Sequence, residues 1–289
     1  MEGANVTIAR RRIQAAGRSV SFLEAGPADG PVVVLLHGLA SDCTTWDPAL
    51  EPLAAGGLRV IAVDLIGHGQ SDKPSGKYLL TDFADSLAAF FAAAGIARAT
   101  VCGHSLGGAI AVHFAYHYGD LVEGLVLVSA GGLGREVHPV LRAAAVPGSE
   151  RVLAAAISPS MQRLYRWPRF HRLLRLTPEN LVNLRRAGRT LGTPEGREAF
   201  FAALRGVIEP AGQRGTFMEM NYLAAHMPTL LVWAEGDGVI PVAHARAAHA
   251  HLPGSRLVVF PGTGHEPHRR NAGEFAAEVV DFVTAYQSH

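Results

Sequence analysis

Apolar positions along the chain follow two alternating patterns. Short runs rich in β-branched residues are separated by alanine-rich segments whose apolar residues recur every three or four positions. The first pattern is typical of buried strands and the second of amphipathic helices. We expect strands at residues 19–24, 32–36, 59–63, 99–102, 121–128, 229–234 and 256–260, and helices at 80–94, 106–118, 242–252 and 274–286. This order predicts an α/β fold with a mostly parallel sheet wrapped by helices.

The alternation stops after Ser129 and resumes at Thr229. A glycine-rich junction at 131–134 opens the intervening segment, which is helical in character, carries proline turn signals and contains no convincing strand. One sheet interrupted by an insertion explains this pattern better than two tandem domains. We therefore expect a core domain of residues 1–133 and 222–289 and a helical cap of residues 134–221.

The segment Gly103-His104-Ser105-Leu106-Gly107 lies between a predicted strand and a predicted helix. In that context G-x-S-x-G is typical of a nucleophile elbow, a strained turn that lifts the serine hydroxyl clear of the sheet. Side chains two residues on either side of the serine would collide with the neighbouring strand and helix, so glycine is needed there. The pattern indicates that Ser105 is a catalytic nucleophile.

Four further motifs occur at ends of predicted strands. They are His37-Gly38, Gly67-His68-Gly69-Gln70-Ser71, Trp233-Ala234-Glu235-Gly236-Asp237 and Gly262-Thr263-Gly264-His265. With the elbow, they make the chain resemble the α/β-hydrolase superfamily, in particular the capped branch with meta-cleavage C–C hydrolases, esterases, cofactor-free haloperoxidases and epoxide hydrolases. The resemblance implies an eight-stranded, mostly parallel sheet with helices on both faces. Epoxide hydrolases use an aspartate nucleophile, and Ser105 at that position argues against their chemistry.

The resemblance also assigns the two partners of the nucleophile. A serine hydroxyl needs a neighbouring base, and His265 follows a strand and a glycine-rich loop where the family holds its base. His268 is the plausible rival. Asp237 matches the position of the family's acid, which orients the imidazole, and Glu235 is its local competitor. The expected triad is Ser105, His265 and Asp237.

An oxyanion intermediate needs two fixed hydrogen-bond donors. The resemblance places them at the backbone N–H groups of Leu106, directly after the nucleophile, and of Leu39. Asp64 is more consistent with fastening the loop around Gly67 and Gly69. His104 occupies the variable position of the elbow and is expected to point away from the substrate.

Composition and charge narrow the partners. The formal net charge of +1 gives no field that would attract nucleic acid or acidic membranes. The two cysteines, Cys43 and Cys102, are too few for a disulfide framework. No signal peptide, membrane span, metal-ligand spacing or dinucleotide motif is evident. We expect a cytoplasmic protein without cofactor or metal that acts on a small molecule, with homo-oligomerisation possible.

Charge is unevenly distributed, since residues 134–221 hold fourteen arginines and seven glutamates but no lysine or aspartate. Solvated helix faces on an acidic core explain this distribution. Alternatively, an arginine turns inward and receives a substrate carboxylate.

The leading hypothesis is hydrolysis of a carboxylic ester or related acyl bond, through an acyl-enzyme, in a small and partly apolar molecule. C–C bond hydrolysis of a vinylogous diketone acid uses the same residues, and thioester or lactone hydrolysis and perhydrolysis stay open. A ligand sensor that retains a triad but turns over slowly is the alternative from another class.

Overall fold

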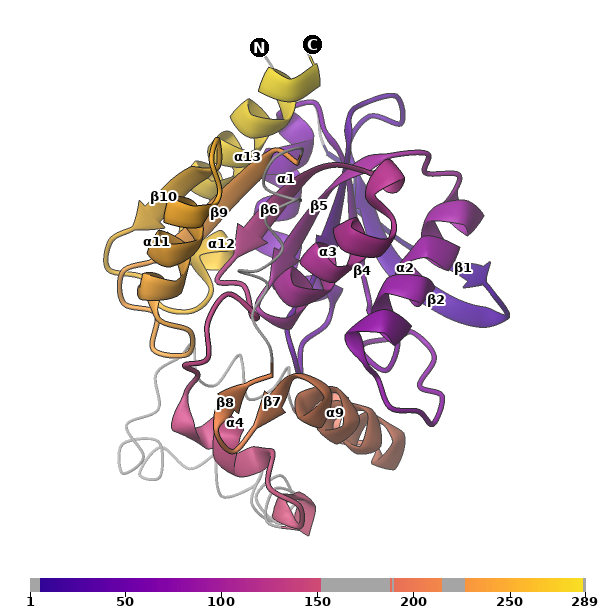
Figure 1. Cartoon of the computed structure of the whole chain (residues 1–289). Coiled ribbons are helices and arrows are strands. Elements are labelled where there is room, and N and C mark those ends of the chain that lie inside the picture. Colours follow the sequence, from indigo (N-terminus) through magenta and orange to yellow (C-terminus); the bar gives the residue numbers. More distant parts are fainter. Residues whose placement is uncertain (1–5, 152–187, 189, 215–226, 288–289) are drawn as a thin grey trace, which may run out of the picture.

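An eight-stranded sheet forms the centre of the molecule (Figure 1). The structure is a computed structural model that describes residues 6–151, 188, 190–214 and 227–287. The spatial order of the strands is β1-β2-β4-β3-β5-β6-β9-β10. Their bounds are β1 Ala9–Ala15, β2 Arg18–Ala25, β3 Val32–Leu36, β4 Arg59–Val63, β5 Ala99–His104, β6 Val122–Val128, β9 Thr229–Ala234 and β10 Arg256–Phe260.

Strand direction follows the prediction. β2 pairs antiparallel with β1 and with β4, and every other neighbouring pair is parallel. The mostly parallel, eight-stranded sheet is therefore confirmed. The sequence pattern did not reveal β1, because this edge strand is largely exposed and carries three consecutive arginines in place of apolar residues.

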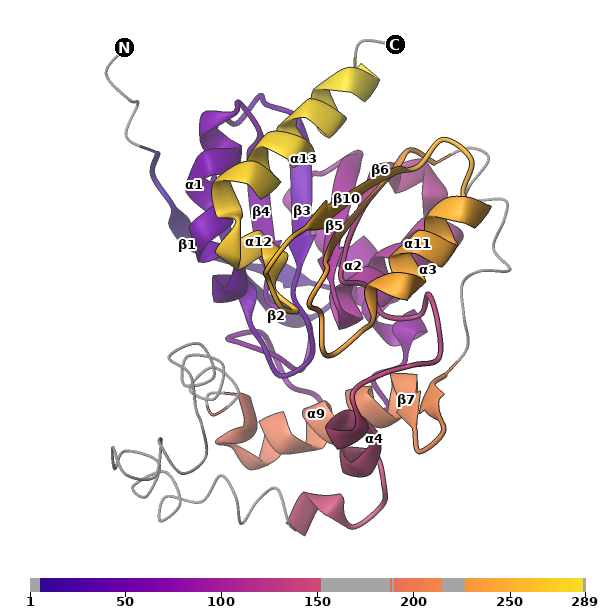
Figure 2. The ribbon, with the colours of Figure 1, turned by 90° about the vertical axis from the view of Figure 1, so that its left-hand side faces the viewer.

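Helices cover both faces of the sheet (Figure 2). The helices α2 (Leu80–Ala94), α3 (Leu106–His117) and α11 (Val242–His251) contribute to one apolar cluster. On the opposite face, α1 (Asp47–Ala55) and α13 (Ala272–Gln287) pack against a second cluster. The short helix α12 (Pro267–Arg270) precedes α13. This arrangement confirms the predicted layers.

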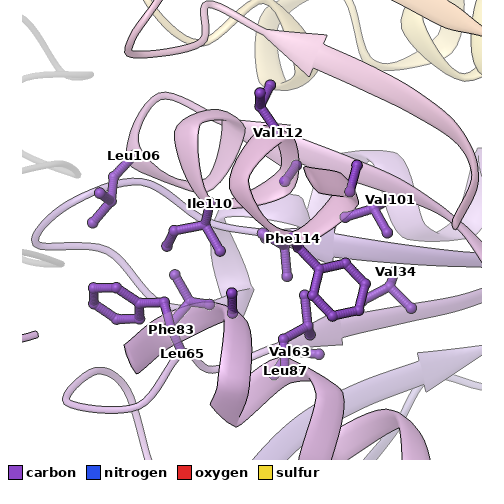
Figure 3. Packing of buried hydrophobic residues seen from close by; sticks show 14 of the residues in the cluster. Val34, Val63, Leu65, Phe83, Leu87, Val101, Leu106, Ile110, Val112 and Phe114 are labelled. Atoms are coloured by element: carbon purple, nitrogen blue, oxygen red, sulfur yellow. The ribbon is translucent and has the colours of Figure 1, made fainter. Parts of the chain in front are cut away.

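Successive residues of each central strand face opposite clusters. In β3, Val34 and Leu36 join the cluster beneath α2 and α3, whereas Val33 and Leu35 join the other one. All four side chains are fully buried. Figure 3 shows the first cluster from close by, and it includes Ile110 and Phe114 of α3 and Val34 of β3. Burial on both faces explains why these strands read as continuous apolar runs.

The described parts of the segment between β6 and β9 lie together beyond one end of the sheet (Figures 1 and 2). They comprise α4 (Pro139–Ala144), α9 (Pro194–Val207) and a hairpin of β7 (Ile208–Glu209) and β8 (Gly212–Gln213). The expectation of no strand here was wrong in this detail, because two-residue strands are too short to show an alternating pattern. The apolar side chains of α9 and the elements around it form a separate cluster that includes Phe200, Phe201 and Leu204.

None of the described helices combines the length and the apolar character that a membrane crossing requires.

Candidate active site

The turn at Ser105 has the geometry of a strained strand-to-helix junction. Ser105 follows β5 directly, precedes α3, and has φ 54° and ψ −116°. A positive φ is unfavourable for a residue with a side chain and costs about 1–3 kcal/mol. A Cβ on Gly103 would lie 2.1 Å from the carbonyl oxygen of Gly107, and one on Gly107 would lie 2.3 Å from that of Leu36. A side chain at either position would collide with backbone atoms, which cannot move aside, so both positions require glycine as predicted.

Parallel strands bring the three predicted catalytic residues to one edge of the sheet. Asp237 follows β9 and His265 follows β10, while Ser105 follows β5. These strands are close neighbours in the order β5-β6-β9-β10, so their carboxyl ends meet. Among the described residues, no hydrogen bond joins Oγ of Ser105 to the imidazole of His265. Such contacts are often long without substrate.

His265 and Asp237 form a direct pair. Nδ1 of His265 lies 2.9 Å from Oδ2 and 3.1 Å from Oδ1 of Asp237. Oδ1 also accepts the backbone N–H groups of Val239 and Ile240, at 2.8 and 3.0 Å. Burial disfavours the carboxylate, but the hydrogen bond and charge of His265 and the two N–H groups outweigh it and lower the pKa of Asp237. Asp237 is therefore ionised at neutral pH and fixes the ring through Nδ1, which leaves Nε2 for another partner.

His104 supports the loop of His265. Its Nε2–H donates to the backbone carbonyl of His265 at 2.9 Å, and the two rings lie 4.8 Å apart. Burial, followed by the nearby His265, lowers the pKa of His104 to about 3, so the ring is neutral. His104 is absent from the pocket wall, as expected. The expectation did not include its contact with the His265 loop, because nothing in the motif signals a bond to a residue 161 positions away.

The two sequence rivals lie elsewhere. His268 is fully buried, with its ring 4.3 Å from that of Trp46 and Nε2 3.3 Å from Oγ1 of Thr45. Glu235 is exposed and pairs with Arg246 at 2.8 Å. Neither rival lines the pocket of Ser105, and His265 and Asp237 do not line it either. The hydrogen bond between His265 and Asp237 is what favours these two residues over their rivals.

The two residues predicted to supply the oxyanion donors lie in the same pocket wall as the nucleophile. Leu39 and Leu106 both line the pocket with Ser105. Leu39 follows Gly38, where an added Cβ would lie 3.2 Å from Cβ of Ser105 and 3.1 Å from Nδ1 of His104. Glycine thus lets the loop after β3 pack closely against the elbow.

Asp64 fastens loops behind the site. Its carboxylate accepts backbone N–H groups of Cys43 at 2.7 Å and Gln70 at 2.9 Å, and Arg10 lies 3.2 Å away. A Cβ on Gly69 would meet this carboxylate at 2.2 Å, which explains the glycine. Asp64 is fully buried and does not line the pocket of Ser105.

The pocket wall is mostly apolar and comes from both the sheet edge and the segment after β6. Its described lining residues are Leu39, Leu80, Ser105, Leu106, Ala109, Gly131, Gly132, Val137, Leu141, Val207, Ile208, Gln213, Arg214, Val239 and Ile240. Sequence reasoning missed Gln213. Its Oε1 accepts the N–H of Gly132 at 2.8 Å, and its Nε2 donates to the carbonyl of Glu136 at 3.2 Å. A lone glutamine after a turn gives no signal of that role.

Six of the fourteen arginines counted in the sequence lie in the described residues: Arg135, Arg142, Arg151, Arg197, Arg205 and Arg214. The other eight, and the apolar residues of 153–174, are outside them. Across the described ranges, no three His, Cys, Asp or Glu side chains gather as metal ligands would.

Comparison with known proteins adds to this geometry. A family model described as alpha/beta hydrolase fold matches residues 31–271. An uncharacterized protein of Mycobacterium tuberculosis is 36% identical over 258 residues, which cover 88% of this chain and 75% of the relative. The 2-hydroxy-6-oxo-6-(2'-aminophenyl)hexa-2,4-dienoic acid hydrolase of Metapseudomonas resinovorans is 26% identical over 285 residues, covering 95% and 90% of the two chains.

A solved structure shares the architecture. The esterase RhEst1 from Rhodococcus sp. ECU1013 superposes with a TM-score of 0.70 at 26% identity, over 96% of this chain and 99% of its own.

Proposed function

The chain belongs to the alpha/beta hydrolase fold family, and from that premise we propose that it is a serine hydrolase that cleaves a carboxylic ester or related acyl bond. The substrate is a small, partly apolar molecule, in keeping with the mostly apolar pocket wall. The observation that carries the proposal is the strained backbone of Ser105, a non-glycine residue with φ 54° that lines this pocket. Strain of this kind clusters at functional sites.

In the proposed mechanism, Oγ of Ser105 attacks the ester carbonyl while Nε2 of His265 takes its proton. Asp237 holds the ring through Nδ1 and stabilises the imidazolium. The backbone N–H groups of Leu39 and Leu106 donate to the oxyanion, and each donor of this kind is worth about 3 kcal/mol. His265 then protonates the leaving alcohol. Water, deprotonated by the same ring, releases the acid and restores Ser105.

We also propose that residues 134–221 form a cap over this site. Val137, Leu141, Val207 and Ile208 from this segment line the same pocket as Ser105 and Leu106. A cap that supplies one wall of the pocket would set substrate shape, whereas the triad would set the chemistry.

C–C bond hydrolysis of a vinylogous diketone acid is the second candidate. A relative at 26% identity is named as the hydrolase of a dienoic acid, and the same three residues would serve that reaction.

A kinetic screen over acyl esters, thioesters, lactones and diketone acids tests the proposal. We expect many turnovers on at least one ester by the wild type and none by Ser105→Ala. A better rate on diketone acids would favour the C–C hydrolase. A single event per molecule, followed by a change of shape, would instead identify a ligand sensor.

A further inference from the structure

The pocket around Ser105 carries a cationic side chain on its wall. Among its described lining residues, only Ser105, Gln213 and Arg214 have polar side chains, and Arg214 is the charged one. Both polar ends of Gln213 are occupied, by the N–H of Gly132 and the carbonyl of Glu136. Gln213 is therefore a structural anchor, and Arg214 is left to meet a polar group of the substrate.

The hairpin holds Arg214 in this wall. Its backbone N–H donates to the carbonyl of Val207 at 2.8 Å, and that of Gln213 donates to the carbonyl of Arg135 at 2.9 Å. The buried side chain of Gln213 ties the same strand to Gly132, next to Gly131, whose N–H donates to the carbonyl of Ser105 at 2.9 Å. The backbone of Arg214 is thus tied through short contacts to the nucleophile turn.

Four of the other five described arginines of this segment have partners, and the fifth, Arg151, does not line the pocket. Arg135 pairs with Glu209 at 3.1 Å, Arg142 donates to the carbonyl of Pro210, and Arg197 donates to that of Leu191. Arg205 donates to the carbonyl of Ala145 and pairs with Glu150. Within the described ranges, the guanidinium of Arg214 forms no ion pair or hydrogen bond. Arg214 therefore differs from these four arginines in two ways: it lines the pocket, and its guanidinium has no partner among the described residues.

We infer that Arg214 binds a carboxylate carried by the substrate, so that the site selects esters or acyl compounds with a free acid group away from the scissile bond. This inference rests on the proposed function and specifies its substrate class. The guanidinium presents parallel N–H donors that match the two oxygens of a carboxylate. Because Arg214 is exposed, salt should weaken the attraction, and the acid preference is best measured at low ionic strength.

The test compares the 4-nitrophenyl monoester of adipic acid with the primary amide of the same ester, after subtraction of the uncatalysed rates. The two substrates differ in charge at the far end and share the scissile bond. For the wild type we expect kcat/KM to be at least tenfold higher for the acid. In Arg214→Gln the ratio should fall below about threefold. Arg151→Gln removes one positive charge from an exposed position of the same segment that does not line the pocket, and should keep the wild-type ratio and rates.

Equal wild-type rates on acid and amide, or a tenfold preference that survives in Arg214→Gln, would overturn the inference. The wild-type ratio is informative even if a variant fails to fold. If both compounds are hydrolysed at equal rates and Ser105→Ala hydrolyses neither, the inference about Arg214 fails while the proposed function stands. Failure to hydrolyse either of these activated esters would count against the proposed function itself.

Discussion

At the scale of single residues, the site depends on how Asp237 directs the imidazole. Its carboxylate is buried, Oδ1 accepts two backbone N–H groups, and Nδ1 of His265 lies within hydrogen-bond distance of both oxygens and nearer to Oδ2. An acceptor at this place requires the proton of the neutral ring to sit on Nδ1. Nε2 is then the lone-pair nitrogen that can accept the proton of Ser105.

Asp237→Asn should preserve the fold and remove activity. The asparagine oxygen can still accept from Val239 and Ile240, but its amide would donate to Nδ1 and move the ring proton to Nε2. We expect kcat to fall by about 10⁴-fold, the cost of the wrong tautomer in a triad. Steady-state kinetics, with thermal unfolding as the check on folding, measures this.

Glu235→Gln is the matched control, since Glu235 is an exposed carboxylate that pairs with Arg246. It should change kcat less than twofold or so. Near-normal activity in Asp237→Asn would give the acid role to another group.

At the scale of elements, the position of Ser105 depends on how closely α3 approaches the sheet. A Cβ on Gly107 would lie 2.3 Å from the carbonyl oxygen of Leu36 and 2.7 Å from that of His37. Both belong to the backbone that leads from β3 into the loop at Gly38. Any side chain at 107 must therefore push the helix and this loop apart.

Gly107→Ala should lower the free energy of unfolding by about 1–3 kcal/mol, the usual cost of overpacking. Activity should fall more than tenfold, because the loop bearing Leu39 would shift relative to Ser105. Gly119→Ala is the control, since no atom lies within 4 Å of its added Cβ. Equal stability and activity in the two variants would show that the close approach is not needed.

The elements differ in how well the sequence predicted them. Central strands such as β3 were found because both faces are buried, and the elbow because its glycines are required sterically. The helix α1 was not predicted, although Trp46, Leu50 and Leu53 are fully buried there and just before it. Two prolines in this short helix, Pro48 and Pro52, hide its periodicity. The hairpin that carries Gln213 was missed because only tertiary contacts define it.

At the scale of the whole molecule, burial of neutral histidines links folding to pH. Burial lowers the pKa of His68 and of His104 from 6.5 to about 3. The neighbours His37 and Lys73 contribute to this shift for His68, and His265 contributes to it for His104. In the unfolded chain both rings take up a proton near their ordinary pKa.

Stability should therefore fall as pH decreases below about 6.5, because the unfolded state then binds protons that the folded state excludes. Each such histidine contributes a slope approaching about 1.4 kcal/mol per pH unit. The free energy of unfolding can be measured with urea between pH 7.5 and 5. Its dependence on pH should be weaker in His104→Gln than in the wild type, by the slope that one buried histidine contributes. Glutamine keeps a donor near the place of Nε2. An unchanged slope would mean that His104 is not a buried neutral ring.

Labelling with a fluorophosphonate is the sharpest experiment on the proposed role of Ser105 as the covalent nucleophile. Intact-protein mass spectrometry should find one equivalent on the wild type, and peptide mapping should place the adduct on Ser105. Asp237→Asn should react far more slowly, because the probe requires the activated hydroxyl. Ser105→Ala should remain unlabelled. Labelling that persists in Ser105→Ala, or an adduct mapped to another residue of the wild type, would mean that Ser105 is not the nucleophile.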